Sequence, residues 1–211
     1  MSTPKPQIRS AFATPLCIHY LPVAAEVNAE LRPLILETLE KRGERRANGW
    51  CSSADFESWG KLGAQTLFRM LRELGDSMTS TCTGGRVTLQ WVSRAWAEVR
   101  QKGEAVAPAA RPGAFWAGLY VVDDGYGKSD DETLGGECEV MDPRGALSGY
   151  FPADLAFRIP GGGTAGMSEV LRPKSGMILM HPGWMVRAER TFSGPGQRMT
   201  IEFELALPHQ S

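Results

Sequence analysis

The sequence predicts a mainly β fold with helices in its N-terminal part, an α+β arrangement of the jelly-roll or β-sandwich kind. Apolar residues recur at helical spacing only before about residue 85. From Arg86 onward, short runs of alternating apolar and polar residues are separated by Gly, Pro and Asp. Strands and helices do not alternate, which argues against a parallel α/β sheet.

Two helices are predicted in the first part of the chain. An extended segment at residues 12–21 precedes the first, whose apolar positions are Val27, Leu31, Leu34 and Ile35. Pro33 is close enough to its start to mark a first turn or a kink. The second helix has a clear apolar stripe and ends before a turn at Gly84–Gly85; the stripe is Leu67, Met70, Leu71, Leu74 and Met78.

Strands are predicted at residues 87–91, 95–100, 115–122, 137–141, 177–188 and 198–207. Because side chains alternate along a strand, His181, Arg187 and Glu189 share one face of the fifth. On the last strand an unusually polar face lies opposite Met199, Ile201, Phe203 and Leu205; its members are Arg198, Thr200, Glu202 and Glu204.

Length and charge restrict the functional classes. The 211 residues fit one domain, 1–211, with a helical part at 1–85 and a β part at 86–208. The net charge is −1 and Lys and Arg are scattered, so neither nucleic acid nor an anionic membrane is an expected partner. No apolar run reaches about 20 residues and residues 1–9 lack an export signal, which predicts a cytoplasmic protein.

Several segments are similar to one known family. They are Trp96–Asp123, with Trp-Ala-Glu-Val-Arg and Trp-Ala-Gly-Leu-Tyr-Val-Val, then Asp142-Pro-Arg144, residues 173–184, residues 198–203, and Gly49-Trp50 with Ser52. On these motifs the chain resembles a family of bacterial 2-oxoglutarate/Fe(II)-dependent oxygenases. The resemblance covers most of the chain and implies a cupin-like double-stranded β-helix buttressed by helices.

The departures from this family fall on its metal ligands. Where the family has His-x-His-Pro, this chain has Ala109-Ala110-Arg111-Pro112, and Arg187 stands at the position of a later family histidine. Alanine has no donor atom and a guanidinium repels a metal cation. Fe(II) is therefore not expected, and the chain is interpreted as a divergent member without the metal ligands. His181 is a weak candidate ligand, because one imidazole makes a poor iron site.

Other family positions are retained. Arg198 and Thr200 match the residues that the resemblance implies for the distal carboxylate of 2-oxoglutarate, and a guanidinium donates two parallel hydrogen bonds to a carboxylate. Arg111, Arg187 and Arg198 in one barrel need a negative partner. Glu202 is one candidate; the other is a bound anion, with Trp116 and Tyr120 as a pocket wall.

Three functions remain open. The first is a metal-independent, non-catalytic pseudoenzyme that binds a small anionic metabolite, such as 2-oxoglutarate or another dicarboxylate, and needs no cofactor. The second is an active oxygenase with unusual ligands that include His181. The third is a structural or interaction protein whose barrel is closed by an Arg111/Arg187/Glu202 network. Such a protein could form a homodimer. Residues 161–163 are expected to form a loop rather than a phosphate cradle, and residues 123–132 a solvated hairpin tip.

Overall fold

The computed structural model describes residues 13–41, 49–59, 62–144 and 168–208. Two α-helices lie in the first part, α1 (Ala24–Lys41) and α2 (Leu62–Ser77), with a short 3-10 helix at Phe56–Trp59 and another at Glu132–Leu134. The strands are β1 (Cys17–Tyr20), β2 (Trp50–Cys51), β3 (Val92–Arg100), β4 (Val106–Ala109), β5 (Trp116–Asp123), β6 (Cys138–Val140), β7 (Glu169–Leu171), β8 (Met177–Pro182), β9 (Arg187–Glu189) and β10 (Arg198–Ala206). The fold is thus mainly β with helices first, as predicted.

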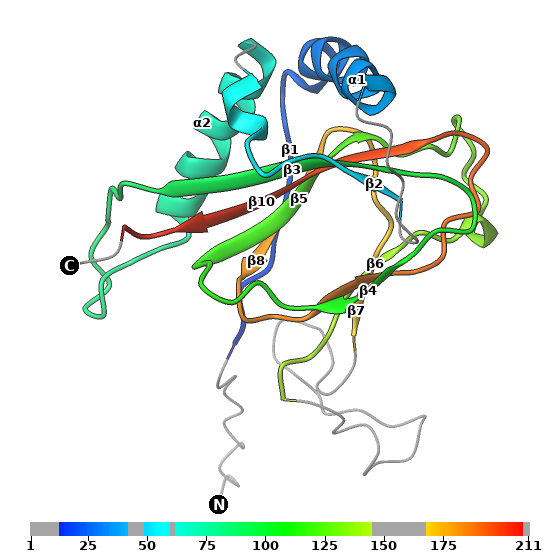
Figure 1. The fold of residues 1–211 in the computed structure, drawn as a ribbon. Coiled ribbons are helices and arrows are strands. Elements are labelled where there is room, and N and C mark those ends of the chain that lie inside the picture. Colours follow the sequence, from blue (N-terminus) through cyan, green and yellow to red (C-terminus); the bar gives the residue numbers. More distant parts are fainter. Residues whose placement is uncertain (1–12, 42–48, 60–61, 145–167, 209–211) are drawn as a thin grey trace, which may run out of the picture.

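The strands form two facing sheets. The large sheet has the order β1-β8-β5-β10-β3-β2, and the small sheet has the order β4-β9-β6-β7. Every strand pairing in the two sheets is antiparallel. The helices α1 and α2 lie on the face of the large sheet that is turned away from the small sheet (Figure 1). The space between the two sheets is the interior of the barrel.

The main apolar core lies between the helices and the large sheet. Leu31 and Ile35 of α1 and Leu67 and Leu71 of α2 are fully buried there, against β10 residues such as Phe203. These are the positions that helical spacing selected from the sequence, because residues three and four apart share one face of a helix.

Pro33 was expected to mark either the first turn of the first helix or a kink in it. The first of these is wrong, because α1 begins at Ala24 and Pro33 lies in its interior. Pro33 is exposed to solvent.

A smaller apolar cluster lies between the two sheets. Its members come from β5, β6, β8 and the turn after β8; they are Leu119, Val121, Cys138, Val140, Met177, Leu179 and Met185. This cluster fills only part of the inter-sheet space, because the inward face of β10 is polar although the strand is buried almost throughout. Each buried charge without a partner would destabilise the fold by roughly several kcal/mol. The fold therefore has to neutralise them internally.

Two strand predictions are wrong in their extent. Residues 87–91 are not a strand, and β3 begins only at Val92. Instead of a sheet partner, this segment has Asp76, whose carboxylate accepts hydrogen bonds from the Leu89 backbone at 3.0 Å and from Trp91 Nε1 at 2.9 Å. A local pattern of alternation cannot distinguish such side-chain anchoring from pairing in a sheet.

The predicted strand at 177–188 is two strands. β8 ends at Pro182 in the large sheet, and β9 starts at Arg187 in the small sheet. A turn separates them, with the Met185 N–H donating to the Pro182 carbonyl at 3.0 Å. His181 and Arg187 consequently face each other across the interior from different sheets.

The acidic segment 123–132 is more than a solvated hairpin tip. Tyr126 within it is buried and contacts Arg198, and Asp123 pairs with Arg32 at 3.0 Å. Residues 161–163 lie outside the described residues. Within the described ranges, no helix is long and apolar enough to cross a membrane.

Candidate functional site

Three strands present charged side chains to the space between the sheets. Arg198, Thr200, Glu202 and Glu204 of β10 stand in register with Arg100, Glu98, Trp96 and Arg94 of β3, respectively. β9 of the small sheet faces them with Arg187 and Glu189, both buried. Like charges directly opposite on paired strands repel, so the Arg198–Arg100 pair requires a counter-charge between them.

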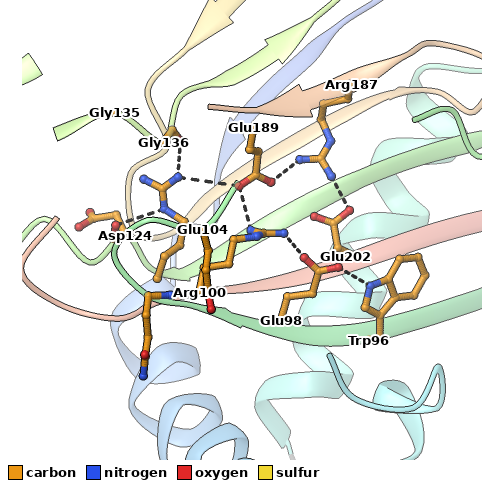
Figure 2. A network of polar contacts seen from close by, with 12 residues as sticks. Trp96, Glu98, Arg100, Glu104, Asp124, Gly135, Gly136, Arg187, Glu189 and Glu202 are labelled. Atoms are coloured by element: carbon orange, nitrogen blue, oxygen red, sulfur yellow. Dashed lines mark hydrogen bonds and ion pairs between the residues drawn. The ribbon is translucent and has the colours of Figure 1, made fainter. Parts of the chain in front are cut away.

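A chain of ion pairs crosses from one sheet to the other (Figure 2). Glu189 accepts hydrogen bonds from Arg100 Nη1 at 2.8 Å and from Arg187 Nη1 at 2.6 Å. Arg187 Nη2 donates to Glu202 Oε2 at 2.5 Å. Arg100 Nη2 pairs with Glu98, which also accepts a hydrogen bond from the Trp96 indole. Glu189 thus joins the small sheet to β3, and Arg187 joins it to β10.

The inner charges of this network balance. Its buried arginines are Arg100, Arg187 and Arg198, and their carboxylate partners are Glu98, Glu189 and Glu202. These three positive and three negative groups sum to zero, and at the outer edge Glu204 pairs with both Arg94 and Arg111. Of the two sources of negative charge considered for the barrel, the structure contains the internal one: Glu202 contacts Arg187 and, at 3.5 Å, Arg111. The inner part of the network, Arg100, Arg187 and Arg198 with Glu98, Glu189 and Glu202, is neutral without an external anion.

The charges around Glu189 and Arg187 determine the protonation states of these two residues. Burial raises the pKa of the Glu189 carboxyl, but Arg100, Arg187 and Arg198 more than offset that effect, so its pKa lies below the ordinary value. Burial lowers the pKa of the Arg187 guanidinium, and Glu202 and Glu189 outweigh it, so its pKa lies well above the ordinary value. Both groups are charged at neutral pH.

Glu98 differs from Glu189. Burial raises the pKa of its carboxyl; Arg100 opposes the rise and the neighbouring Glu202 adds to it, and the net effect is a raised pKa. As the pH falls, Glu98 therefore gains a proton before Glu189 does.

Arg198 is held by the protein itself. Its side chain is 1 % exposed and donates to the Tyr126 hydroxyl at 2.6 Å, to the Asp124 carbonyl at 3.3 Å and to the Gly136 carbonyl. Gly136 has a φ of +78°, and a Cβ there would lie 2.5 Å from the guanidinium, so only glycine allows this approach. The guanidinium that the resemblance implies for a dicarboxylate thus already has backbone and phenol acceptors.

Thr200, the partner expected for the same carboxylate, lies on the same face of β10. Its hydroxyl is buried and has no hydrogen-bond partner. The two residues therefore differ: Arg198 is fully engaged, whereas Thr200 retains hydrogen-bonding capacity.

A small cavity marks the positions of the expected metal ligands. Ala109 on β4 pairs in register with Arg187 on β9, and both line the cavity together with Arg111, His181 and Glu202. The volume is about 10 Å³, which is the space of about one water molecule. The structure thus brings together the three positions that the sequence comparison singled out.

These residues do not fit an iron ion. A non-haem iron site needs about three donors, usually two His and one carboxylate. Here two guanidinium groups, those of Arg111 and Arg187, line the cavity instead. Among the described residues, no group of three or more His, Cys, Asp or Glu side chains is placed to hold a metal.

His181 lies beside this cavity as a buried, hydrogen-bonded side chain. Its Nδ1 lies 2.9 Å from the Pro182 carbonyl and donates to it. Burial lowers the pKa of the imidazole; the Pro182 carbonyl opposes this and Arg187 adds to it. The imidazole is neutral at pH 7, with its Nε2 lone pair on the side opposite to Pro182.

The lowered pKa of His181 predicts how stability depends on pH. An unfolded histidine takes up a proton near pH 6.5, and the folded one only at lower pH. Between these values the unfolded state binds more protons, so the free energy of unfolding falls as the pH drops below about 6.5. We expect His181→Asn to flatten this slope in urea titrations between pH 7.5 and 5.5. An unchanged slope in that variant would contradict the assignment.

Trp116 and Tyr120 are not part of the site. They lie on the helix-facing side of β5, in the main core. The Trp116 indole donates to Thr79 at 2.9 Å, and the Tyr120 hydroxyl donates to Asn28 at 2.6 Å. The prediction that they share a face is correct, but that face is turned away from the barrel interior, because the helices cover it.

Glu189, Arg100 and Glu98 are network members that the sequence interpretation did not assign to the site. A signal was present in the sequence: Glu98 and Arg100, and likewise Arg187 and Glu189, are opposite charges two residues apart on strands. Side chains at that spacing share one face, and two such pairs on buried strands indicate an ion network.

Comparison with known proteins supports the fold assignment. The sequence matches no protein-family model and no curated protein. Similar solved structures include a prolyl-4-hydroxylase from Pseudomonas putida (TM-score 0.59, 11% identity, 92% of this chain and 94% of that one). AviO1 from Streptomyces viridochromogenes has a TM-score of 0.59 at 14% identity, with 94% and 92% covered. HygX from Streptomyces hygroscopicus, with nickel and 2-oxoglutarate bound, has a TM-score of 0.60 at 12% identity, with 94% and 85% covered.

The chain therefore has the same overall fold as these solved structures, among them a prolyl-4-hydroxylase. At these identities the likeness concerns the fold, and the chemistry has to be argued from the residues of the site.

Proposed function

We propose that this protein is a metal-independent, non-catalytic relative of the 2-oxoglutarate/Fe(II) oxygenases, whose barrel is closed by its own ion network. The observation that carries the proposal is the position of Arg187. It stands in register with Ala109 at the cavity and pairs with both Glu189 and Glu202. A fixed positive charge, held by two carboxylates, takes the place in which the related fold would need metal donors.

The energetics support the same proposal. Each buried arginine of the network has a carboxylate partner within the chain, so the interior is electrostatically complete. A cavity of about 10 Å³ is far smaller than the several hundred Å³ of ordinary ligand pockets. Binding of 2-oxoglutarate inside the barrel would require several of these ion pairs to break.

Metal titration of the purified protein tests the proposal. We expect no thermal shift and no saturable heat on addition of Fe(II) under anaerobic conditions, or of Ni(II) as a stable substitute, with or without 2-oxoglutarate. We also expect no succinate above the blank when oxygen and ascorbate are present. Stoichiometric Fe(II) retained through purification, or succinate formation that depends on the protein, would refute the proposal.

A second candidate function is the binding of a small anion at Arg198 and Thr200. The buried Thr200 hydroxyl without a hydrogen-bond partner favours it, and the full set of protein acceptors around Arg198 opposes it. Titration with succinate and with phosphate tests it. A saturable shift that Thr200→Val abolishes would support this second function, and equal shifts in both proteins would rule it out.

A further inference from the structure

One residue that lines the cavity has a buried oxygen without a hydrogen-bond partner. Among the described lining residues this oxygen is Glu202 Oε1; the side chain is 2 % exposed, and only its other oxygen, Oε2, contacts Arg187 and Arg111. A buried carboxylate oxygen is an acceptor, so the group that would satisfy it is a hydrogen-bond donor. Glu202 therefore has room for one more hydrogen-bond donor and none for an acceptor.

Arg111 covers this carboxylate loosely. Its Nη2 lies 3.5 Å from Glu202 and its Nε lies 4.0 Å from Glu204, compared with 2.5 Å between Arg187 and Glu202. Its side chain is 28 % exposed, whereas that of Arg187 is 5 % exposed. Arg111 is thus the most weakly held guanidinium of the network.

The surroundings of Arg111 have the composition of a guanidinium-binding site. The guanidinium carbon lies 5.0 Å from the centre of the Trp96 ring. An aromatic face with carboxylates beside it attracts a planar, delocalised cation by stacking and by paired hydrogen bonds. The orientation of the Trp96 ring is fixed by the hydrogen bond that its indole N–H donates to Glu98 at 2.8 Å.

The backbone at Arg111 is fixed independently of its side chain. The Arg111 N–H donates to the Gly183 carbonyl at 2.7 Å, and the Arg111 carbonyl accepts from the Ala114 N–H at 3.2 Å. Removing the side chain therefore leaves the loop in place and opens the space in front of Glu202.

We propose that the mouth of the barrel is a guanidinium-binding site that the protein fills with its own Arg111. An arginine side chain of a partner peptide, or another alkylguanidinium, would take the same place between Trp96, Glu202 and Glu204 when Arg111 swings outward. This inference rests on the metal-free state proposed above, because a metal at the cavity would itself satisfy Glu202.

The test is chemical replacement of the missing side chain. Arg111→Ala is titrated with methylguanidinium chloride by calorimetry and by thermal unfolding, with sodium chloride at equal ionic strength as the reference. We expect the variant to bind methylguanidinium at least about tenfold more tightly than the wild type and to be stabilised by it. N-methylurea, which is neutral and similar in shape, is expected to give no shift.

Two further variants separate the site from general charge effects. Arg94→Ala also removes a guanidinium next to Glu204, at 3.2 Å, but Arg94 does not line the cavity, so this variant should respond like the wild type. Arg111→Ala with Glu204→Gln should bind methylguanidinium more weakly than Arg111→Ala alone. The proposal is overturned if Arg111→Ala binds no more tightly than the wild type, or if succinate stabilises it more than methylguanidinium. Such a result leaves the metal titration of the wild type unaffected, so the two proposals fail separately.

Discussion

Replacing Glu189 with glutamine is expected to lower the free energy of unfolding by about 3–5 kcal/mol, the range for breaking a buried ion pair from one side. Glu189 is 3 % exposed and lies 2.8 Å from Arg100, 2.6 Å from Arg187 and 3.8 Å from Arg198. Without its charge, three guanidinium groups share only Glu98 and Glu202. Urea unfolding followed by circular dichroism measures the loss.

A matched control is Glu139→Gln. Glu139 lies outside the network and pairs at 3.3 Å with Arg190, which is 51 % exposed, and such surface pairs contribute about 0–1 kcal/mol. A double variant, Arg187→Met with Glu189→Leu, removes both charges of one pair and should lose less than the two single variants together. Equal, small losses at Glu189 and Glu139 would show that the network does not hold the sheets together.

Restoring donors at the cavity is expected to create a divalent-metal site. In the triple variant Ala109→His/Arg111→Ala/Arg187→His, two histidines face Glu202 in the donor set of two His and one carboxylate. The variant loses two positive charges and a divalent ion returns two. We therefore expect it to be less stable than the wild type without metal and to be stabilised by Ni(II) or Co(II), by about 2.7 kcal/mol at a concentration 100 times the Kd.

Thermal unfolding with and without Ni(II), and the visible spectrum with Co(II), measure this gain. The same triple variant with Glu202→Gln is the control, and it should respond at least about tenfold more weakly because the carboxylate ligand is missing. If the triple variant shows no metal-dependent shift, Ala109, Arg187 and Glu202 do not converge as the cavity indicates.

Strand parity and helical spacing were the most informative features of the sequence. The stripe containing Leu67 and Leu71 predicted the buried face of α2, and the alternation along β10 separated its apolar face from its charged one. These features are local, because side-chain direction repeats every two residues in a strand and about every 3.6 in a helix. The similar solved structures support the mainly β fold with two helices that the sequence predicted.

The sequence alone did not predict the contacts between residues that are far apart in the chain. Arg100 and Glu189 are 89 residues apart and meet only because β9 leaves the line of β8 and joins the other sheet. Trp116 and Tyr120 had the correct parity, but which face of β5 the helices cover is a property of the assembled layers. Arg198 was expected to face a ligand, and it meets the Gly136 carbonyl because a distant loop with a positive φ folds over it.

The position of β10 has a consequence for the order in which the chain can fold. β10 is the last strand in the sequence, yet it lies between β5 and β3 in the large sheet and carries Arg198 and Glu202. During synthesis, β3 and β5 therefore cannot pair with β10, the strand between them, until residues 198–206 have left the ribosome. Until β10 pairs with β3, the side chains of Glu98 and Arg100 stay in contact with water. The pairing of β10 with β3 joins segments far apart in the chain, so it carries a large cost in chain entropy. The charges of β3 can therefore be buried against β10 only after residues 198–206 have been made.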